Sequence, residues 1–241
     1  MKIYTYYENI DFNHQDRLLD FWKSSWEIHG VDAIVLTQSD VQNHPFYEEF
    51  LNRLEQIHIK LTNNNPSKYV LSCWVRWLAY STQKEEKFYV SDYDVINHNF
   101  KPMEPEDVLC LLDGNCPCIA SGTPSQFYQL LKDIINFSEN HFDILKAEYD
   151  QLYYIIPNGE RRLLPYHDQT FFQICKKINP NLVKMSRNRQ TFLGTPLASN
   201  FWEKQVVHYG YSSCIKYCEQ NNIKYQKHES KTIVIEKYLK L

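Results

Sequence analysis

The amino-acid sequence predicts an α/β fold, in which helices flank a central and mostly parallel sheet. Segments rich in β-branched and aromatic residues alternate with segments of helical periodicity, an order typical of parallel strands joined by helical crossovers. The segment 33–36 (AIVL) is wholly apolar, as expected of a strand that is covered on both faces. With 241 residues, 43% of them apolar, the chain is long enough for one domain with a substantial core.

The first predicted strand and helix are marked by their composition and their ends. Residues 2–7 (KIYTYY) are mostly β-branched or aromatic and precede a polar run, which predicts a strand. In residues 15–27 the apolar side chains recur at helical spacing, and Gly30 ends the predicted helix. The apolar strand 33–36 follows.

Two more helices and a strand are predicted before the middle of the chain. Pro45 suits the first turn of a helix over 45–57, and Ser67 is a suitable N-cap for a helix over 67–80. Residues 87–90 (KFYV) then predict a strand that runs directly into the segment SDYDV.

Shorter patterns predict the remaining elements. They are strands at 108–112, 118–120 and 205–208, and helices at 124–137, 168–177 and 212–221. We expect one domain over residues 1–221, followed by a charged and peripheral extension at residues 222–241.

Glycine is scarce, and its positions exclude two kinds of nucleotide site. The chain has six glycines, and the closest pair is Gly114 and Gly122. A dinucleotide-binding turn needs three glycines within about six positions, and a P-loop needs two that flank about four residues. Any phosphate that this protein binds must therefore be held by other groups.

Composition also bears on partners and location. The formal net charge of −3 lacks the basic excess of a general nucleic-acid binder, so we expect no nucleic-acid partner. No apolar run approaches the length that spans a bilayer, and residues 1–12 lack the apolar core of a signal peptide. The seven cysteines, an odd number, suggest free thiols in a reducing compartment. We therefore expect a soluble, cytoplasmic protein.

Two aspartates follow the predicted strand 87–90. Asp92 and Asp94 lie two residues apart, so on an extended chain both carboxylates point the same way and can face one hard cation. They also follow the carboxyl end of a strand, which is where open α/β sheets bind ligands. The pair is therefore a candidate metal site.

One helix upstream, Arg76 lies in the segment WVRWLAY at 74–80. A helix with an arginine, followed by an apolar strand and then D-x-D, resembles the metal-dependent glycosyltransferases of the GT-A fold, including small soluble bacterial and virus-encoded members. The resemblance covers roughly residues 1–215. It implies Mn²⁺ or Mg²⁺ as the cofactor and a nucleotide-sugar donor, with a UDP-sugar as the first choice. It also implies a glycan, a glycoprotein or another hydroxyl compound as the acceptor.

The resemblance also implies which residues bind the nucleotide. In such enzymes the first strand and the loop after it hold the base and ribose, so Thr5 and Tyr6 are the candidates, with Tyr7 available to stack on uracil. Tyr93, between the two aspartates, belongs with these cofactor-binding residues.

The resemblance further assigns roles in catalysis and metal binding. Arg76 would brace the aspartates or touch the donor, Asp92 would contact ribose or a metal-bound water, and Asp94 would bind the metal directly. His208, at the end of the predicted strand 205–208, would be a further metal ligand. Asp168, at a predicted helix start, would bond the acceptor hydroxyl or act as its base if the enzyme inverts.

The glycine and the helix after His208 match the family in part. Gly210 comes two residues after the histidine rather than three, which departs from the pattern of retaining members. The helix that opens at Ser212 and Ser213 would direct its N-terminal dipole toward the diphosphate.

Each of these residues also admits a structural interpretation. Asp92 and Asp94 could form a solvated turn, Arg76 a structural ion pair, His208 a core histidine and Asp168 a helix cap.

Other functions also stay open at this point. They are a catalytically inactive nucleotide- or glycan-binding protein on the same fold, and a metal-dependent phosphodiesterase built on the aspartates and His208. A zinc site that combines Cys116 and Cys118 with Cys214 and Cys218 lacks the usual two-residue gap in its first pair.

Overall fold

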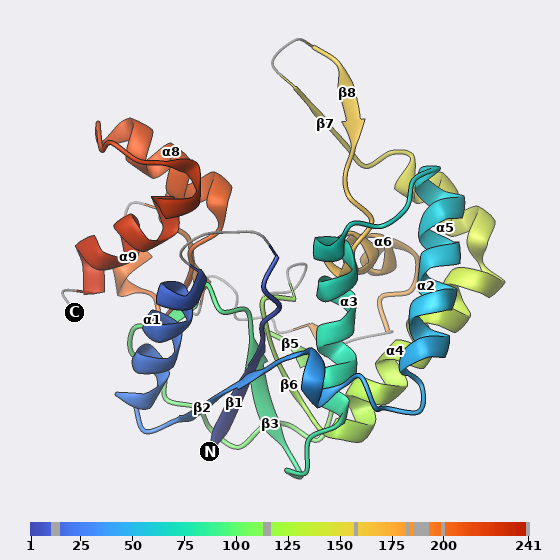
Figure 1. The fold of residues 1–241 in the computed structure, drawn as a ribbon, viewed down its shortest axis with the longest axis horizontal. Coiled ribbons are helices and arrows are strands. Elements are labelled where there is room, and N and C mark those ends of the chain that lie inside the picture. Colours follow the sequence, from blue (N-terminus) through green and yellow to red (C-terminus); the bar gives the residue numbers. More distant parts are fainter. Residues whose placement is uncertain are drawn as a thin grey trace.

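The fold is the predicted α/β class, with a central six-stranded sheet between two groups of helices (Figure 1). The computed structural model describes residues 1–10, 15–112, 117–156, 159–181, 184–185, 193–198 and 201–239. In spatial order the sheet contains β2 (Asp32–Leu36), β1 (Lys2–Tyr6), β3 (Phe88–Ser91), β6 (Ile119–Gly122), β5 (Cys110–Leu111) and β9 (Lys184–Met185).

The strands of this sheet are mostly parallel. The pairs β1–β2, β1–β3 and β5–β9 are parallel, whereas β6 runs antiparallel to both β3 and β5. Two small sheets accompany it. One has the order β10 (Leu193–Gly194), β11 (Val206–His208), β4 (Val95–Asn97), and the other is the hairpin of β7 (Tyr153–Ile155) and β8 (Arg161–Leu163).

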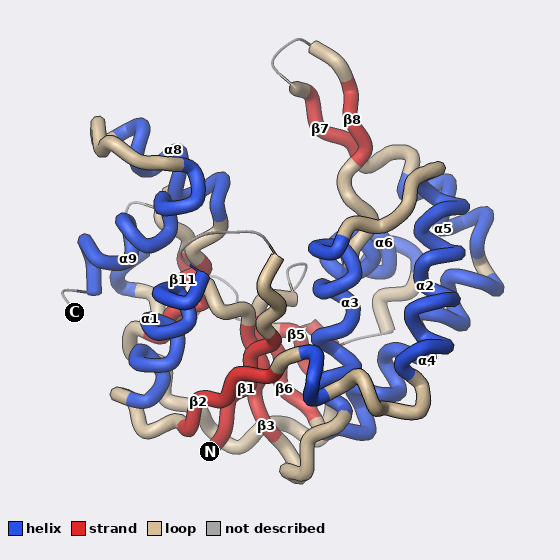
Figure 2. The backbone as a smooth tube through the Cα atoms, viewed as in Figure 1, coloured by secondary structure: helices blue, strands red, loops and turns tan. Residues whose placement is uncertain are grey.

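The helices lie in two groups on opposite sides of the sheet (Figures 1 and 2). One group contains α2 (Tyr47–Thr62), α3 (Lys68–Ser81), α4 (Pro124–Asn140), α5 (Phe142–Tyr149) and α6 (Asp168–Ile178). The other contains α1 (Gln15–Glu27), α8 (Tyr211–Gln220) and α9 (Ser230–Leu239). Short 3₁₀ helices occupy Gln38–Asp40, Phe201–Glu203 and Lys227–Glu229.

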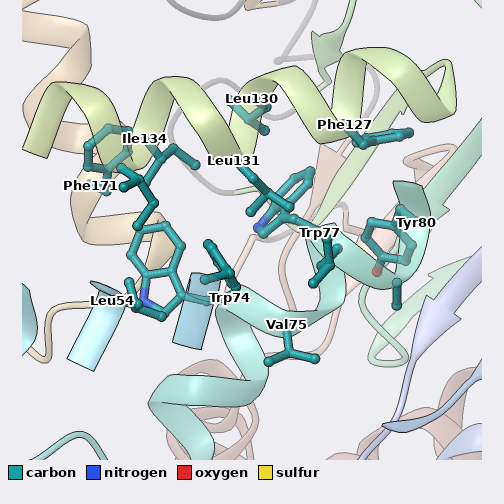
Figure 3. Close-up of a cluster of buried hydrophobic side chains, with 14 of the residues drawn as sticks. Leu54, Trp74, Val75, Trp77, Tyr80, Phe127, Leu130, Leu131, Ile134 and Phe171 are labelled. Atoms are coloured by element: carbon teal, nitrogen blue, oxygen red, sulfur yellow. The ribbon is translucent and has the colours of Figure 1, made fainter. Parts of the chain in front are cut away.

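The first group of helices packs around the indole rings of α3 (Figure 3). Trp74 and Trp77 are fully buried, and the ring of Trp77 meets that of Phe127 on α4, with 5.9 Å between the centroids. Helix α3 begins where predicted, because the Ser67 hydroxyl accepts a hydrogen bond from the Val70 amide at 3.3 Å. This core packs the helix that carries Arg76 against the sheet.

A second core contains Trp22 and Trp26 of α1 together with buried residues of the sheet, α8 and α9. Helix α1 also binds both ends of the loop between β3 and β4. The Trp22 indole N–H donates to Ser91 Oγ at 2.8 Å, before the loop, and the Trp26 indole N–H donates to the Val95 carbonyl at 3.3 Å, after it. Ser25 Oγ accepts from the amide of β4 residue Asn97 at 3.1 Å. The loop Asp92–Asp94 is therefore held at each end by one helix.

The C-terminal segment differs from the peripheral extension expected for residues 222–241. Helix α9 packs against α1 and α8, and its residues Val234 and Ile235 are fully buried in the second core. The charged composition of the segment obscured this packing, since Val234 and Ile235 stand in a short stretch that also holds Lys231, Glu236 and Lys237.

Element boundaries differ from the predictions in a few places. Helix α2 continues to Thr62 rather than ending at residue 57, and the β7–β8 hairpin was not predicted. The hairpin projects from the body of the molecule (Figure 1). Within the described residues, no helix combines the length and the apolar character that crossing a membrane requires.

Candidate functional site

The site is built on the loop that follows β3, as the position of the aspartates predicted. Asp92 is the first residue after this strand, and its amide donates to the Cys118 carbonyl at 2.8 Å. The Val95 amide donates back to the Asp92 carbonyl at 3.0 Å, which closes a tight turn around Tyr93. The turn places both carboxylates at the carboxyl end of the sheet.

Strand β11 brings His208 to the same place. It runs antiparallel to β4 and pairs His208 with Val95, and the Tyr209 amide donates to the Asp94 carbonyl at 2.8 Å. One oxygen from each aspartate and one ring nitrogen of His208 lie within 4.8 Å of one another. This set of two hard oxygens and one imidazole fits a divalent cation, and Mn²⁺ better than Mg²⁺ because of the nitrogen.

A lysine that the sequence analysis did not assign completes the surroundings of Asp94. Lys231 of α9 places Nζ 2.6 Å from Asp94 Oδ2, and His208 Nε2 lies 3.5 Å from Oδ1. Burial alone would raise the pKa of the Asp94 carboxyl, but the attraction of Lys231 and His208 outweighs burial and holds that pKa well below its usual range. Asp94 is therefore a carboxylate, and since it is only 7% exposed, it is not part of a solvated turn.

Arg76 braces the other aspartate. Its guanidinium bonds to Asp92 Oδ1, and its Nε donates to Asp168 Oδ2 at 2.9 Å. Burial would lower the pKa of Arg76, but the two carboxylates raise it well above its usual range, so the guanidinium stays charged. Arg76 thus forms a structural ion pair, which was the alternative interpretation of this residue. The pair positions Asp92, a candidate metal ligand.

Asp168 is occupied on both oxygens. Oδ2 accepts from Arg76 and from the Trp77 indole N–H at 2.8 Å, and Oδ1 accepts from the Gln169 amide at 2.7 Å. Its side chain is 2% exposed, and although burial would raise its pKa, Arg76 and then His167 and Trp77 keep that pKa below its usual value. These bonds suit a residue that positions Arg76, and the role of Asp168 toward an acceptor stays a prediction.

A cleft opens on both sides of the loop. One arm has a volume of about 400 Å³ and the other about 450 Å³. The arms share the wall formed by Tyr69, Cys73, Arg76, Asp92, Asp94, Tyr211 and Lys231. The first arm is lined further by Tyr6, Glu8, Ile10, Gln15, Ser72 and Tyr93, and the second by Pro117, His167, Asp168, Gln169, His208, Gly210, Ser212 and Ser213.

The predicted nucleotide-binding residues take different positions around the first arm. Tyr6 and Tyr93 line it, whereas Thr5 is fully buried within β1 and its hydroxyl has no hydrogen-bond partner. The Tyr7 hydroxyl donates to Asp16 at 3.1 Å, and its ring meets the Tyr93 ring edge-on. Tyr6 and Tyr93 are therefore the two of this group that can face a ligand in this arm.

The cysteine alternatives gain no support from the described residues. Cys118, Cys214 and Cys218 are buried in the second core, and Cys116 lies outside the described residues. Cys73 borders the cleft, but burial raises the pKa of its thiol, so it is not a ready nucleophile.

Sequence reasoning missed several residues of the cleft, among them Lys231, Gln15 and Tyr69, and Lys231 carried a usable signal. Lys231 precedes Val234 and Ile235 by three and four positions, which places it on the apolar face of its helix. A lysine in that position is either paired or functional. Gln15 and Tyr69 reach the cleft from the start of α1 and of α3, and their spacing gives no comparable signal.

Comparisons with known proteins find no matching family model and no matching curated protein. Among solved structures, the chain is similar to the crystal structure of the glycosyltransferase GlyE from Streptococcus pneumoniae TIGR4, with a TM-score of 0.45 and 8% sequence identity. The alignment covers 99% of this chain but only 63% of that structure. A likeness this distant assigns no role to any residue here.

Proposed function

We propose that this chain is a metal-dependent glycosyltransferase of the GT-A, D-x-D type, which moves a sugar from a nucleotide-sugar, most simply a UDP-sugar, to a hydroxyl acceptor. The observation that carries the proposal is the cluster of Asp92, Asp94 and His208 beside the two arms of the cleft. Candidate cation ligands, an aromatic arm and a polar arm meet there, and metal-dependent sugar transfer from a nucleotide would use all three.

The first arm suits a nucleoside. Tyr6 and Tyr69 provide aromatic rings for the face of a base, and Gln15 Oε1 is buried in the same wall without a hydrogen-bond partner. Leaving such an oxygen unpaired costs about 1–3 kcal/mol, so a ligand that donates an N–H to Gln15 would recover that free energy. The N–H groups of a nucleobase are donors of this kind.

The second arm suits the diphosphate and the sugar. Helix α8 begins at Tyr211 in its wall, so the amides of the first turn and the helix dipole favour an anion there. Asp92, Asp94 and His208 would hold Mn²⁺ or Mg²⁺, which acts as a Lewis acid on the charge that develops on the departing diphosphate. Arg76 fixes Asp92, and Asp168 fixes Arg76. This arrangement explains how a chain without a glycine-rich loop could bind phosphates.

A thermal-shift experiment tests the proposal. UDP together with Mn²⁺ is expected to raise the melting temperature, because a ligand that binds only the folded state stabilises it. Asp94→Ala should abolish that shift, whereas Asp20→Ala, which removes an exposed carboxylate from α1, should leave it intact. The proposal fails if UDP, GDP and Mn²⁺ in combination leave the melting temperature of the wild-type protein unchanged.

Donor hydrolysis separates transfer from the other functions. A panel of nucleotide-sugars with Mn²⁺ should contain one that the protein hydrolyses slowly without an acceptor. Binding of a nucleotide without any such turnover would indicate an inactive binding protein. Cleavage of a simple phosphodiester would instead indicate a phosphodiesterase.

A further inference from the structure

A buried lysine shares a carboxylate with the candidate metal site. Lys231 is the second residue of α9 and is 6% exposed, and its ammonium lies 2.6 Å from Asp94 Oδ2. It comes from the C-terminal helix, far in sequence from the loop that it contacts. Lys231 also lines both arms of the cleft, so it can meet a ligand in either.

The ammonium and a divalent ion would draw on the same carboxylate. His208 lies 3.5 Å from Oδ1 of Asp94, and Lys231 lies 2.6 Å from Oδ2. The ammonium of Lys231 therefore already neutralises the negative charge of Asp94. An ion held by Asp92, Asp94 and His208 would bring two positive charges next to that ammonium, and their repulsion is strong where water is largely excluded. The lysine therefore opposes the ion as long as it stays on Asp94.

Two tyrosine rings lie beside the ammonium where it contacts Asp94. Nζ lies 4.0 Å from the centroid of the Tyr211 ring and 5.9 Å from that of the Tyr93 ring. The faces of tyrosine rings attract a cation, and both rings border the cleft. An ammonium that leaves Asp94 can therefore remain in the cleft and face a bound anion.

We propose that Lys231 is an exchangeable cation. Its ammonium neutralises Asp94 while the metal site is empty, and when a divalent ion binds, it transfers from Asp94 to the phosphates of the ligand. The inference rests on the proposed function, because it takes the ion and a nucleoside diphosphate as the partners. It goes further in linking the two binding events through one side chain.

The exchange predicts that loss of the Lys231 ammonium changes the affinities for Mn²⁺ and for UDP in opposite directions. Lys231→Met removes the competitor, so Mn²⁺ alone should bind about tenfold more tightly, which corresponds to about 1.4 kcal/mol. The same change removes a phosphate partner, so UDP should bind about tenfold more weakly when Mn²⁺ is saturating. A lysine that only holds α9 in place would weaken both.

The experiment measures the two affinities separately. Mn²⁺ binding is followed by the electron paramagnetic resonance of the free ion, and UDP binding at saturating Mn²⁺ by calorimetry. The matched control is Lys237→Met, which removes the same charge from an exposed position of the same helix and should change neither affinity. Lys231→Arg keeps a cation and should leave both affinities near those of the wild type.

The outcomes distinguish the inference from the proposed function. Tighter Mn²⁺ and weaker UDP in Lys231→Met support the exchange, and equal or jointly weakened affinities overturn it. If that variant does not fold, Lys231→Gln, which keeps a hydrogen-bond donor but no charge, should show the same opposite signs. If neither the wild type nor any variant binds Mn²⁺, the metal site fails and the exchange fails with it.

Discussion

The two sides of the Asp92–Asp94 loop carry charge clusters that differ in how firmly they are held. On the side of α3 and α6, Asp168 receives bonds from a guanidinium, an indole and a backbone amide, and its side chain is 2% exposed. On the side of α9, Asp94 faces the ammonium of Lys231 and the ring of His208, and its side chain is 10% exposed.

Two aspartates of one cleft are therefore held in different ways. Two donors to Asp168 are the backbone amide of Gln169 on α6 and the buried indole of Trp77 on α3, and both are held by the packing of their helices. The main partner of Asp94 is the end of a flexible four-carbon chain, which can move without unfolding its helix.

The largest change in stability is expected when Arg76 is replaced, because Arg76 joins Asp92 and Asp168 in one ion-pair cluster, the brace. Arg76→Met should lower the free energy of unfolding by about 3–5 kcal/mol, because it leaves the buried Asp168 and the half-buried Asp92 without their common cation. Urea denaturation measures it. Arg53→Met, which breaks an exposed cluster with Glu49 and Glu139, should cost only about 1 kcal/mol or less. Equal losses in the two variants would mean that the brace is no firmer than a surface ion pair.

The second largest effect is expected on Mn²⁺ binding, when Asp94 is replaced. Asp94→Asn should weaken Mn²⁺ binding about a hundredfold, equivalent to about 2.7 kcal/mol, because a neutral amide replaces the carboxylate. Titration with Mn²⁺ monitored by paramagnetic resonance measures this change, with Asp20→Asn as the exposed control. Unchanged Mn²⁺ affinity in Asp94→Asn would remove the aspartate from the ligand set.

The third prediction concerns Asp168 and pH. Asp168→Asn should lower the free energy of unfolding by about 2 kcal/mol at pH 7, because the bonds from Arg76 lose their charged acceptor. The folded-state pKa of Asp168 lies below its ordinary value of 3.8, so its contribution is complete above about pH 4 and declines as the pH falls further. Between pH 2 and pH 7, the free energy of unfolding should therefore fall less steeply with acid in the variant than in the wild type. Equal slopes in the two proteins would contradict a stabilising bond between Arg76 and Asp168.

The smallest effect on stability is expected at His208. Its side chain is 24% exposed and lies 3.5 Å from Asp94, so His208→Gln should change the free energy of unfolding by less than about 1 kcal/mol. The same variant should still bind Mn²⁺ several-fold more weakly than the wild type. Loss of stability without loss of Mn²⁺ affinity would make His208 a structural residue. The Asp94 cluster would then not differ in role from the Asp168 cluster.

Much of the fold followed from local patterns in the sequence. The wholly apolar segment at β2, the Ser67 cap of α3 and the strand before the aspartates gave the correct α/β class and the position of the loop. Arg76 could be connected with the aspartates because one helix and one strand separate them. The rule that ligands gather at the carboxyl ends of strands then indicated the position of the candidate site.

The rest depended on contacts that no local pattern encodes. Lys231 meets Asp94 across 137 positions, and Arg76 meets Asp168 across 92, so both pairings follow only from how the two groups of helices are placed. The antiparallel insertion of β6 between β3 and β5 also depends on sheet assembly rather than on the composition of the strand. The roles assigned to Thr5, Tyr6, Tyr7 and Tyr93 stay predictions.

The attachment of α1 to the loop has a consequence for the choice of ion. Trp22, Ser25 and Trp26 hold the strands on both sides of the aspartates, so the spacing of the two carboxylates is set by a helix packed behind them. Magnesium demands near-ideal octahedral geometry, whereas larger divalent ions tolerate looser arrangements. Loosening one of these fastenings, as in Ser25→Ala, would therefore penalise Mg²⁺ more than Mn²⁺. Discrimination between the two ions would then depend on hydrogen bonds that touch neither of them.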